Sequence, residues 1–339
     1  MKTLFFAVAT LAVVACQQNT KKEAPTQGEN TPLTTQEETT PPTTQEELPT
    51  LPKTDWEEEG LKGKVKTLTK ILYRGTEKNG KIIKKNLYTE IERNSFNTDG
   101  YYTLKERFSS STNEPAFYYL KFLYNDKKQL IEEINFRKDK EYWRGTYLYN
   151  KQGDCIMITD KLPDFEAEEK HFTYVYTPEG KQKTFSQTLN NRVVKTVTFY
   201  NKKNLILKEE VYTDDQLTLQ DTNTYDEHDR LVKWVSSSDN GDEENLYTYD
   251  SYGNLISYKF TAVGTFTDEQ REYQYDEKGN ILQKHVSIIF FSAANGSAEE
   301  SHSLYTYTYD DQGNILTEIR KDLDRKEIII AEHTIEYYQ

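Results

Sequence analysis

Aromatic residues alternate with polar ones along much of this chain, and each alternating run ends in a short polar stretch. Residues 247–256, 273–282 and 307–316 repeat the pattern most closely, as Tyr-x-Tyr-Asp-x-x-Gly-Asn followed by two aliphatic residues. Two aromatic side chains separated by one residue lie on the same face of a β-strand. The Asp can accept hydrogen bonds from the amides ahead of it, and the Gly can adopt the left-handed conformation of a bulge. Each stretch therefore predicts a β-hairpin.

The tyrosine just before the turn recurs at intervals of 24 to 34 residues. Similarity at a nearly fixed period is the sequence signature of a repeat architecture. These anchor tyrosines are Tyr124, Tyr149, Tyr176, Tyr200, Tyr225, Tyr249, Tyr275 and Tyr309. The glycines predicted at the bulge position are Gly153, Gly180, Gly253, Gly279 and Gly313. Lys128 and Asp229 take that position in two other copies, and the copy at Tyr200 is one turn residue shorter.

A second class of turn lies between these hairpins. Its members are Asn-Gly or Asn-Asn pairs, which suit two-residue turns: Asn79-Gly80, Asn190-Asn191, Asn240-Gly241 and Asn295-Gly296. Two alternating turn classes without a helical stretch between them predict an up-and-down meander. The expected fold is therefore all-β, a long antiparallel meander of repeated hairpins that forms a curved, twisted or partly spiralled sheet.

The Tyr-Asp-x-x-Gly-Asn-Leu units resemble the YD repeats of the RHS family over roughly residues 96–338. The chain departs from the family pattern at Asn254, Asn280 and Asn314, where the family more often has Arg. Large members of that family wind their hairpins into a hollow shell around a toxin. With about ten units, this chain is expected to be too short to close a shell.

The N-terminus has the features of an export signal. Lys2 precedes an apolar run over residues 4–14, which is too short to span a bilayer and suits a signal-peptide core. Residues 13–16, Val-Val-Ala-Cys, resemble the bacterial lipobox, and this resemblance implies that Cys16 is diacylated and becomes the new N-terminus. An ordinary secretory signal with an incidental cysteine is the alternative. Because Gln17 is not an Asp that would retain a lipoprotein in the inner membrane, we expect an outer-membrane lipoprotein, with the leaflet left open.

Three segments follow from these features: a signal peptide over residues 1–15, a lipidated tether over residues 16–54 and a single β domain over residues 55–339. The tether is rich in Thr, Pro, Gln and Glu and has too little apolar area to fold, so it is expected to be disordered and to hold the domain away from the membrane. A loop or short helix is expected over residues 55–59. No Pro- or Gly-rich break divides the remainder.

Charge and motifs narrow the function. A net charge of −13 without a basic tract argues against a nucleic-acid partner. The five histidines, His171, His228, His285, His302 and His333, show no metal-ligand spacing, so no metal or cofactor is expected. The acidic residues 239–244 are interpreted as a hairpin tip rather than a calcium loop. Cys155 is interpreted as a buried, unpaired small hydrophobe.

No nucleophile motif or phosphate-binding loop is present, and the chain is not expected to be an enzyme. Six aromatic pairs, each two residues apart, are expected to form a continuous stripe along one face of the sheet: Phe122 and Tyr124, Tyr147 and Tyr149, Tyr174 and Tyr176, Tyr247 and Tyr249, Tyr273 and Tyr275, and Tyr307 and Tyr309. Two functions are left: a non-catalytic surface module that binds a glycan or an envelope protein through that stripe, or a structural spacer or scaffold without a ligand. A hydrolase is a distant third possibility.

Overall fold

The computed structural model describes residues 53–239, 241–262, 267–290 and 297–339, which form one antiparallel sheet with a single short helix. The first half of the sheet contains β1 (Val65–Lys78), β2 (Lys81–Leu87), β3 (Ile91–Phe96), β4 (Tyr102–Phe108), β5 (Tyr118–Tyr124), β6 (Leu130–Arg137), β7 (Lys140–Tyr149), β8 (Cys155–Lys161), β9 (Glu168–Thr177) and β10 (Gly180–Leu189). The second half contains β11 (Arg192–Asn201), β12 (Ile206–Thr213), β13 (Gln216–Tyr225), β14 (Leu231–Ser238), β15 (Gly241–Tyr249), β16 (Leu255–Ala262), β17 (Thr267–Tyr275), β18 (Ile281–Phe290), β19 (Ser297–Tyr309), β20 (Ile315–Asp322) and β21 (Glu327–Tyr337).

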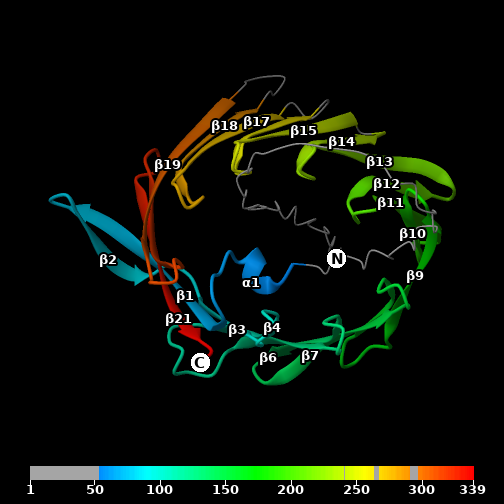
Figure 1. The fold of residues 1–339 in the computed structure, drawn as a ribbon, viewed down its shortest axis with the longest axis horizontal. Helices are drawn as coiled ribbons and strands as arrows, with labels where there is room; N and C mark the ends of the chain where they lie inside the picture. Colours follow the sequence, from blue (N-terminus) through cyan, green and yellow to red (C-terminus); the bar gives the residue numbers. More distant parts are fainter. Residues whose placement is uncertain (1–52, 240, 263–266, 291–296) are drawn as a thin grey trace, which may run out of the picture.

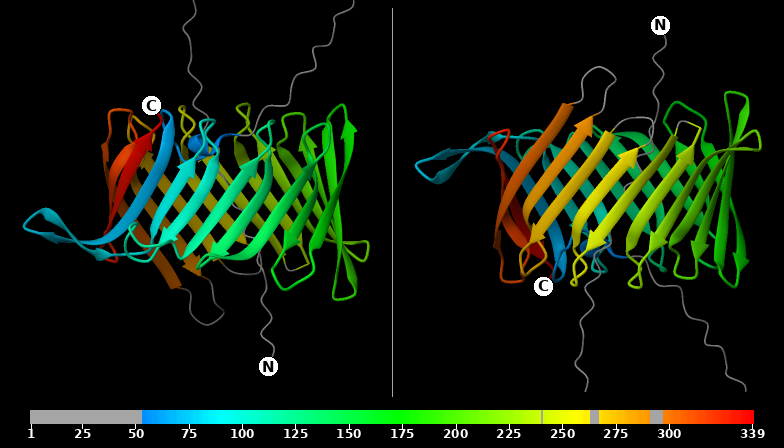
Figure 2. Two further views of the ribbon diagram at one scale, coloured as in Figure 1. Left: turned by 90° about the horizontal axis from the view of Figure 1, so that it is seen from below. Right: turned by 90° about the horizontal axis from the view of Figure 1, so that it is seen from above.

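The sheet closes on itself. Strand β1 pairs with β21 along one edge and with β3 along the other, so that 20 strands form a barrel (Figure 1). Strand β2 pairs only with the far end of β1, and this hairpin projects from the barrel wall (Figure 2). The all-β meander of hairpins is thus confirmed, but the expectation that the repeats are too few to close is wrong. Closure needs only that the last strand pair with the first, and β1 supplies ten paired positions from Val65 to Gly75.

Helix α1 (Asp55–Glu58) lies within the ring of strands, as Figure 1 shows. Thr54 caps it, with its hydroxyl oxygen accepting from the Glu57 amide and the Glu57 carboxylate returning to the Thr54 amide. Trp56 packs against Phe96, with 6.3 Å between ring centroids, and its Nε1 donates to the carbonyl of Val65 at 2.9 Å. The short helix expected over residues 55–59 is confirmed. Because α1 is inside the barrel, the face of the sheet that carries Phe96 is the inner wall.

Each anchor tyrosine ends its strand or stands one residue before the end, so the turns that follow gather at one end of the barrel, here called the repeat rim. At residues 250–254 the amide of Gly253 donates to the carbonyl of Asp250 at 3.1 Å. The Asp250 side chain accepts from the amides of Tyr252 and Asn254, both at 2.9 Å. Gly253 has φ +92°, and Gly153, Gly279 and Gly313 likewise have φ between +83° and +88°. The predicted turn chemistry is confirmed at these four glycines.

Two turns differ from the prediction. Gly180 has φ +154° and pairs directly with Thr177, so this hairpin has a two-residue corner without a bulge. The physical reason is the missing Asx side chain: the Thr177 hydroxyl accepts only from the Glu179 amide, at 3.3 Å, and does not organise a wider turn. The turn after Tyr200, by contrast, is complete, because Asn204 takes the glycine position with φ +61°.

The second turn class lies at the opposite rim and at the tip of the projecting β1–β2 hairpin. Asn79-Gly80 and Asn190-Asn191 have positive φ at both residues, as two-residue hairpin turns require. The sequence did not single out Lys138-Asp139 and Asp214-Asp215, which form the same kind of turn with φ between +48° and +64°. Asn240 and residues 295–296 lie outside the described residues.

Candidate functional site: the tyrosine-lined lumen

The aromatic stripe lies on the inner wall. Side chains opposite each other in paired strands share a face, so the assignment made at Phe96 extends around the barrel through Tyr102, Phe122 and their neighbours. The two tyrosines of each predicted pair are adjacent, with 6.3 Å between the centroids of Tyr273 and Tyr275 and 6.2 Å between those of Tyr307 and Tyr309. The tyrosines therefore face the lumen.

Tyrosine hydroxyls also connect successive repeats. Six of these hydroxyls each donate a hydrogen bond to the backbone carbonyl of the residue that begins the strand after the preceding repeat-rim turn, at 2.5 to 2.9 Å. The pairs are Tyr149 to Leu130, Tyr174 to Cys155, Tyr225 to Ile206, Tyr249 to Leu231, Tyr275 to Leu255 and Tyr307 to Ile281. At the seam, His333 takes this role and its Nδ1 lies 2.9 Å from the Ile315 carbonyl. The stripe is thus a structural ladder as well as the lining of the lumen.

Burial keeps these phenols neutral. It raises the pKa of Tyr149 and of Tyr275 to about 12, with nearby groups adding to the shift. The hydroxyls therefore remain donors throughout the physiological pH range, and one edge of each ring is held against the wall. Tyr176, at the repeat rim, is 45% exposed and is the most open ring of the predicted stripe among the described residues.

Charged side chains share the inner wall with the tyrosines. Lys170 pairs with Asp160 at 2.6 Å, and Lys181 pairs with Asp154. Burial lowers the pKa of Lys183, which lies over the ring of Phe172 at 4.0 Å. Lys181 and Lys183 lie over aromatic faces, where the ring quadrupole stabilises them. The lumen is therefore polar and aromatic, a surface suited to hydroxyl-rich ligands.

A pocket of about 320 Å³ opens in the wall near the opposite rim, between β17 and β21. Its lining includes Arg271, Lys284 and Arg320 together with Glu269 and Asp322. Burial lowers the pKa of Lys284, and the adjacent Arg271 and Arg320 lower it further. The pocket brings both signs of charge together and offers donors and acceptors to a neutral polar ligand.

The outer wall has a different composition. Along β17 the side chains that alternate with the lumen-facing ones are Gln270, Glu272 and Gln274, all exposed. Outward Leu, Ile and Phe side chains occur, but charged ones stand between them at mid-strand, as Lys233 and Glu244 do on paired strands. Charges facing lipid at mid-depth are costly in a membrane barrel, so this wall is suited to water. No helix in the described part of the chain is long and apolar enough to cross a membrane.

Cys155 pairs with Tyr149 and therefore lies on the inner wall beside the aromatic stripe. It is half-buried rather than fully buried, burial raises the pKa of its thiol, and its Sγ lies 3.4 Å from the Met157 carbonyl. Cys16, the signal peptide and almost all of the tether lie outside the described residues. His171 and His228 are exposed. His285 and His302 are stacked together on the outer wall, a proximity that sequence spacing did not reveal.

One family model matches a central segment of the chain. Residues 166–265 match a family model described as an uncharacterised protein. No curated protein matches. Because the matching segment is less than half of the chain, it does not establish membership of a family.

Among solved structures, the chain is similar to a porin-like protein from Bacteroides uniformis, with 10% identity, 80% of this chain and 96% of that chain covered, and a TM-score of 0.34. A porin-like protein from Bacteroides vulgatus has 10% identity, 81% and 98% coverage, and a TM-score of 0.26. The Tc holotoxin pore of Photorhabdus luminescens has 10% identity and a TM-score of 0.25, and 79% of this chain matches 19% of that one. Scores at this level carry no functional argument.

Proposed function

We propose that this protein is a lipid-tethered barrel of the cell envelope that binds a glycan chain in its tyrosine-lined lumen without catalysing a reaction. The observation that carries the proposal is the separation of the two walls. The repeated aromatic pairs face the lumen, whereas the outer wall carries charged and amide side chains at mid-strand and is suited to water. Barrels of 16–18 strands already leave an aqueous channel, so a ring of 20 strands is wide enough for a polymer. The resemblance to YD repeats is consistent with a hollow shell.

The chemistry of the lumen favours a sugar as the ligand. Tyrosine offers a flat apolar face with a polar edge, and sugars present apolar C–H faces bordered by hydroxyls. Here the tyrosine edges are held by the ladder of hydroxyl bonds, so the rings are already oriented and lose little conformational freedom on binding. Lys170 with Asp160, and Lys181 with Asp154, supply donors and acceptors beside the rings.

Binding is tested with the purified full-length chain against envelope and extracellular glycans, followed by isothermal titration of any that are retained. Tyr176→Ala should weaken binding about five- to tenfold, the effect of losing one ring contact worth roughly 1 kcal/mol. Tyr176→Phe keeps the ring face and should bind nearly as well, which separates stacking from the bonds of the hydroxyl to Asp154 and Asn150. Tyr212→Ala removes an aromatic ring from the outer wall and should change nothing. Retention without any effect of Tyr176→Ala would place the ligand outside the lumen.

The tether is tested separately. Cys16→Ser should move the protein from the membrane fraction to the soluble one, because acyl chains on that residue are the proposed anchor. Retention on the membrane after a salt wash would contradict the lipid anchor and leave the lumen proposal untouched.

The second candidate function is a spacer or scaffold with no ligand. The observation that favours it is the hydroxyl ladder itself, which gives the tyrosines a structural role in every copy where it occurs. If no glycan is retained by the full-length chain, the spacer becomes the better account.

A further inference from the structure

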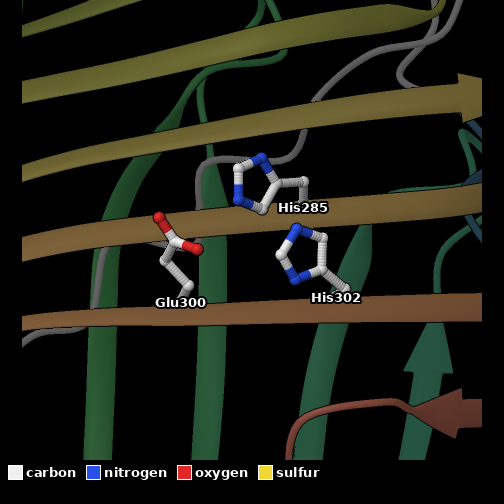
Figure 3. Close-up of side chains that lie close together, drawn as sticks. All are labelled: His285, Glu300 and His302. Atoms are coloured by element: carbon white, nitrogen blue, oxygen red, sulfur yellow. The ribbon is translucent and has the colours of Figure 1, made fainter.

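Three potential ligand side chains converge on the outer wall. His285 lies on β18 directly opposite His302 on β19, and Glu300 is two residues before His302, hence on the same face. One donor atom from each of the three lies within 4.8 Å of the other two. Figure 3 shows the Glu300 carboxylate turned toward the two imidazole rings. The cluster is separate from the lumen and independent of the glycan proposal.

Carboxylates lie beside both rings, and one of them orients the ring of His302. Asp324, between β20 and β21, accepts from the backbone amide of His302 at 2.6 Å and lies 3.2 Å from its Nδ1. Glu272, on β17, lies 3.9 Å from Nδ1 of His285. The Asp324 carboxylate favours the His302 tautomer with hydrogen on Nδ1, which leaves Nε2 with its lone pair free, the usual outer-shell arrangement around a metal-binding histidine. Glu272 is too far from His285 for a direct hydrogen bond. Nε2 of His285 is buried and has no hydrogen-bond partner, so it lacks another role.

We propose that His285, Glu300 and His302 form a binding site for Zn²⁺. Two imidazole nitrogens and one carboxylate oxygen are a donor set that zinc accepts with a water molecule as the fourth ligand. Asp324 acts as a positioning residue rather than a ligand.

Binding requires a local change of geometry. The two imidazole rings are stacked, with centroids 4.2 Å apart and an interplanar angle of 8°. Because a nitrogen lone pair lies in the plane of its ring, the lone pairs of two parallel rings do not converge on one point. Ligands about 2.0–2.1 Å from zinc in a tetrahedron lie roughly 3.3–3.4 Å from one another, so the rings must tilt and Glu300 must move inward. Glu300 is exposed and free to rotate. The bound ion would then join two neighbouring strands at a fixed register.

The site is tested with the full-length chain, prepared without a histidine tag and treated with a chelator. Titration with zinc chloride should show saturable binding of one ion per chain, accompanied by a higher melting temperature that chelator reverses. Cobalt(II) in place of zinc should give the strong visible absorption of a four-coordinate site. Absence of saturable binding by the unsubstituted chain overturns the proposal.

Variants then locate the ion. His302→Ala should abolish the one-ion binding step and the cobalt absorption, and Glu300→Gln should weaken binding. Asp324→Asn should lower affinity roughly 10- to 100-fold, as loss of an outer-shell carboxylate does. His171→Ala is the matched control. The imidazole of His171 is also exposed and lies 2.9 Å from a carboxylate, that of Glu169, but His171 is not part of the cluster formed by His285, Glu300 and His302.

Unchanged affinity in both His302→Ala and Glu300→Gln would place the ion elsewhere and overturn the proposal. Because Glu300 is exposed, Glu300→Gln provides a readout even if His302→Ala perturbs the sheet. Circular dichroism of each variant shows whether the strands are retained.

Discussion

The inner and outer walls of this barrel are formed by the same strands but carry different side chains that make different contacts. On the inner wall, aromatic rings pack in a ladder, and the hydroxyl of one repeat bonds to the backbone of the one before it. On the outer wall, charged and amide side chains are exposed and pair across strands, as Lys233 does with Glu244. A membrane barrel shares the polar interior but has an apolar exterior, so the two kinds of barrel differ at the outer wall. The comparison indicates that the contacts that stabilise the fold most and the candidate ligand surface are both on the inner wall.

The largest expected contrast between the walls comes from removing a whole ring. Tyr102 is 7% exposed, stacks on Phe96 at 5.0 Å and bonds through its hydroxyl to Glu59 beside α1. Tyr102→Ala should destabilise the fold by about 3–5 kcal/mol, as large-to-small changes of buried aromatics do. Tyr212→Ala on the outer wall should cost about 1 kcal/mol or less. Denaturant unfolding of both variants measures the difference, and equal losses would contradict the assignment of the walls.

The next effect concerns the repeat rim. Gly279 has φ +83°, and a Cβ there would lie 3.2 Å from Oδ1 of Asn254. Gly279→Val should therefore cost on the order of 1–3 kcal/mol, because a β-branched residue is strained at positive φ. Lys278→Val in the same corner should cost far less. The denaturant midpoints of unfolding of the two variants test this prediction. Similar midpoints would mean that the turn tolerates any residue at the bulge position and would contradict it.

Acid should weaken the repeat rim more than the rest of the barrel. Burial alone would raise the pKa of Asp250, Asp276 and Asp310, but hydrogen bonds from turn amides and from Asn and Tyr side chains outweigh it and hold each pKa below 3.8. A folded-state pKa below the unfolded one contributes stability above about pH 4 that is lost as pH falls through the folded value. Melting temperature should therefore fall steeply below pH 4.

Replacing the three aspartates with Asn provides the control for that fall. Native copies already use Asn at this position, where Asn125 and Asn201 accept the same turn amides at 2.9–3.0 Å. The triple variant should fold at neutral pH and lose less stability between pH 4 and pH 2.5 than the parent. A parallel decline of both proteins would assign the acid sensitivity to other groups.

The smallest effect comes from single hydroxyls of the ladder. Tyr275→Phe removes the bond to the Leu255 carbonyl while keeping the ring, and should cost about 0.5–1.5 kcal/mol. Tyr212→Phe, whose hydroxyl donates to Glu210 at 2.7 Å on the outer wall, should cost less because water replaces that bond. Thermal unfolding of the pair measures both, and a larger loss at Tyr212 would contradict the structural role of the ladder.

Much of the fold could be predicted because it is encoded locally. The Asp-x-x-Gly corner and the aromatic alternation act within ten residues, which is why the hairpins, the common face of Tyr273 and Tyr275, and the positive φ of Gly279 could be predicted. Closure depends on the pairing of β1 with β21, residues more than 250 positions apart, for which no local pattern exists. The corner at Gly180 was mispredicted because the Thr at position 177 offers a weaker acceptor than Asn or Asp.

The histidine cluster shows the same limit at a site. His285 and His302 are 17 positions apart, and the two-residue turn predicted at Asn295-Gly296 would have placed His285 opposite Thr306 rather than opposite His302. In the structure Phe290 pairs with Ser297, so six residues separate the two strands. Counting back from the anchor Tyr309 and forward from Tyr275 would have placed the two histidines on neighbouring strands, but not directly opposite each other. Asp324 lies in the turn between β20 and β21, and no pattern in the sequence indicated that it would contact His302.

The central claim, that the barrel stands in water on its tether with its polar wall outward, is tested most directly by labelling a cysteine at mid-strand on that wall. Gln270→Cys in a Cys155→Ala background would be treated with a membrane-impermeant maleimide in open membrane fragments that carry the protein. Tyr252→Cys, at a turn position that is 78% exposed, calibrates full reactivity. The account predicts that both cysteines are labelled at similar rates before and after extraction into detergent. Protection of position 270 in membranes, relieved only by unfolding, would show that the wall faces lipid and would contradict the account.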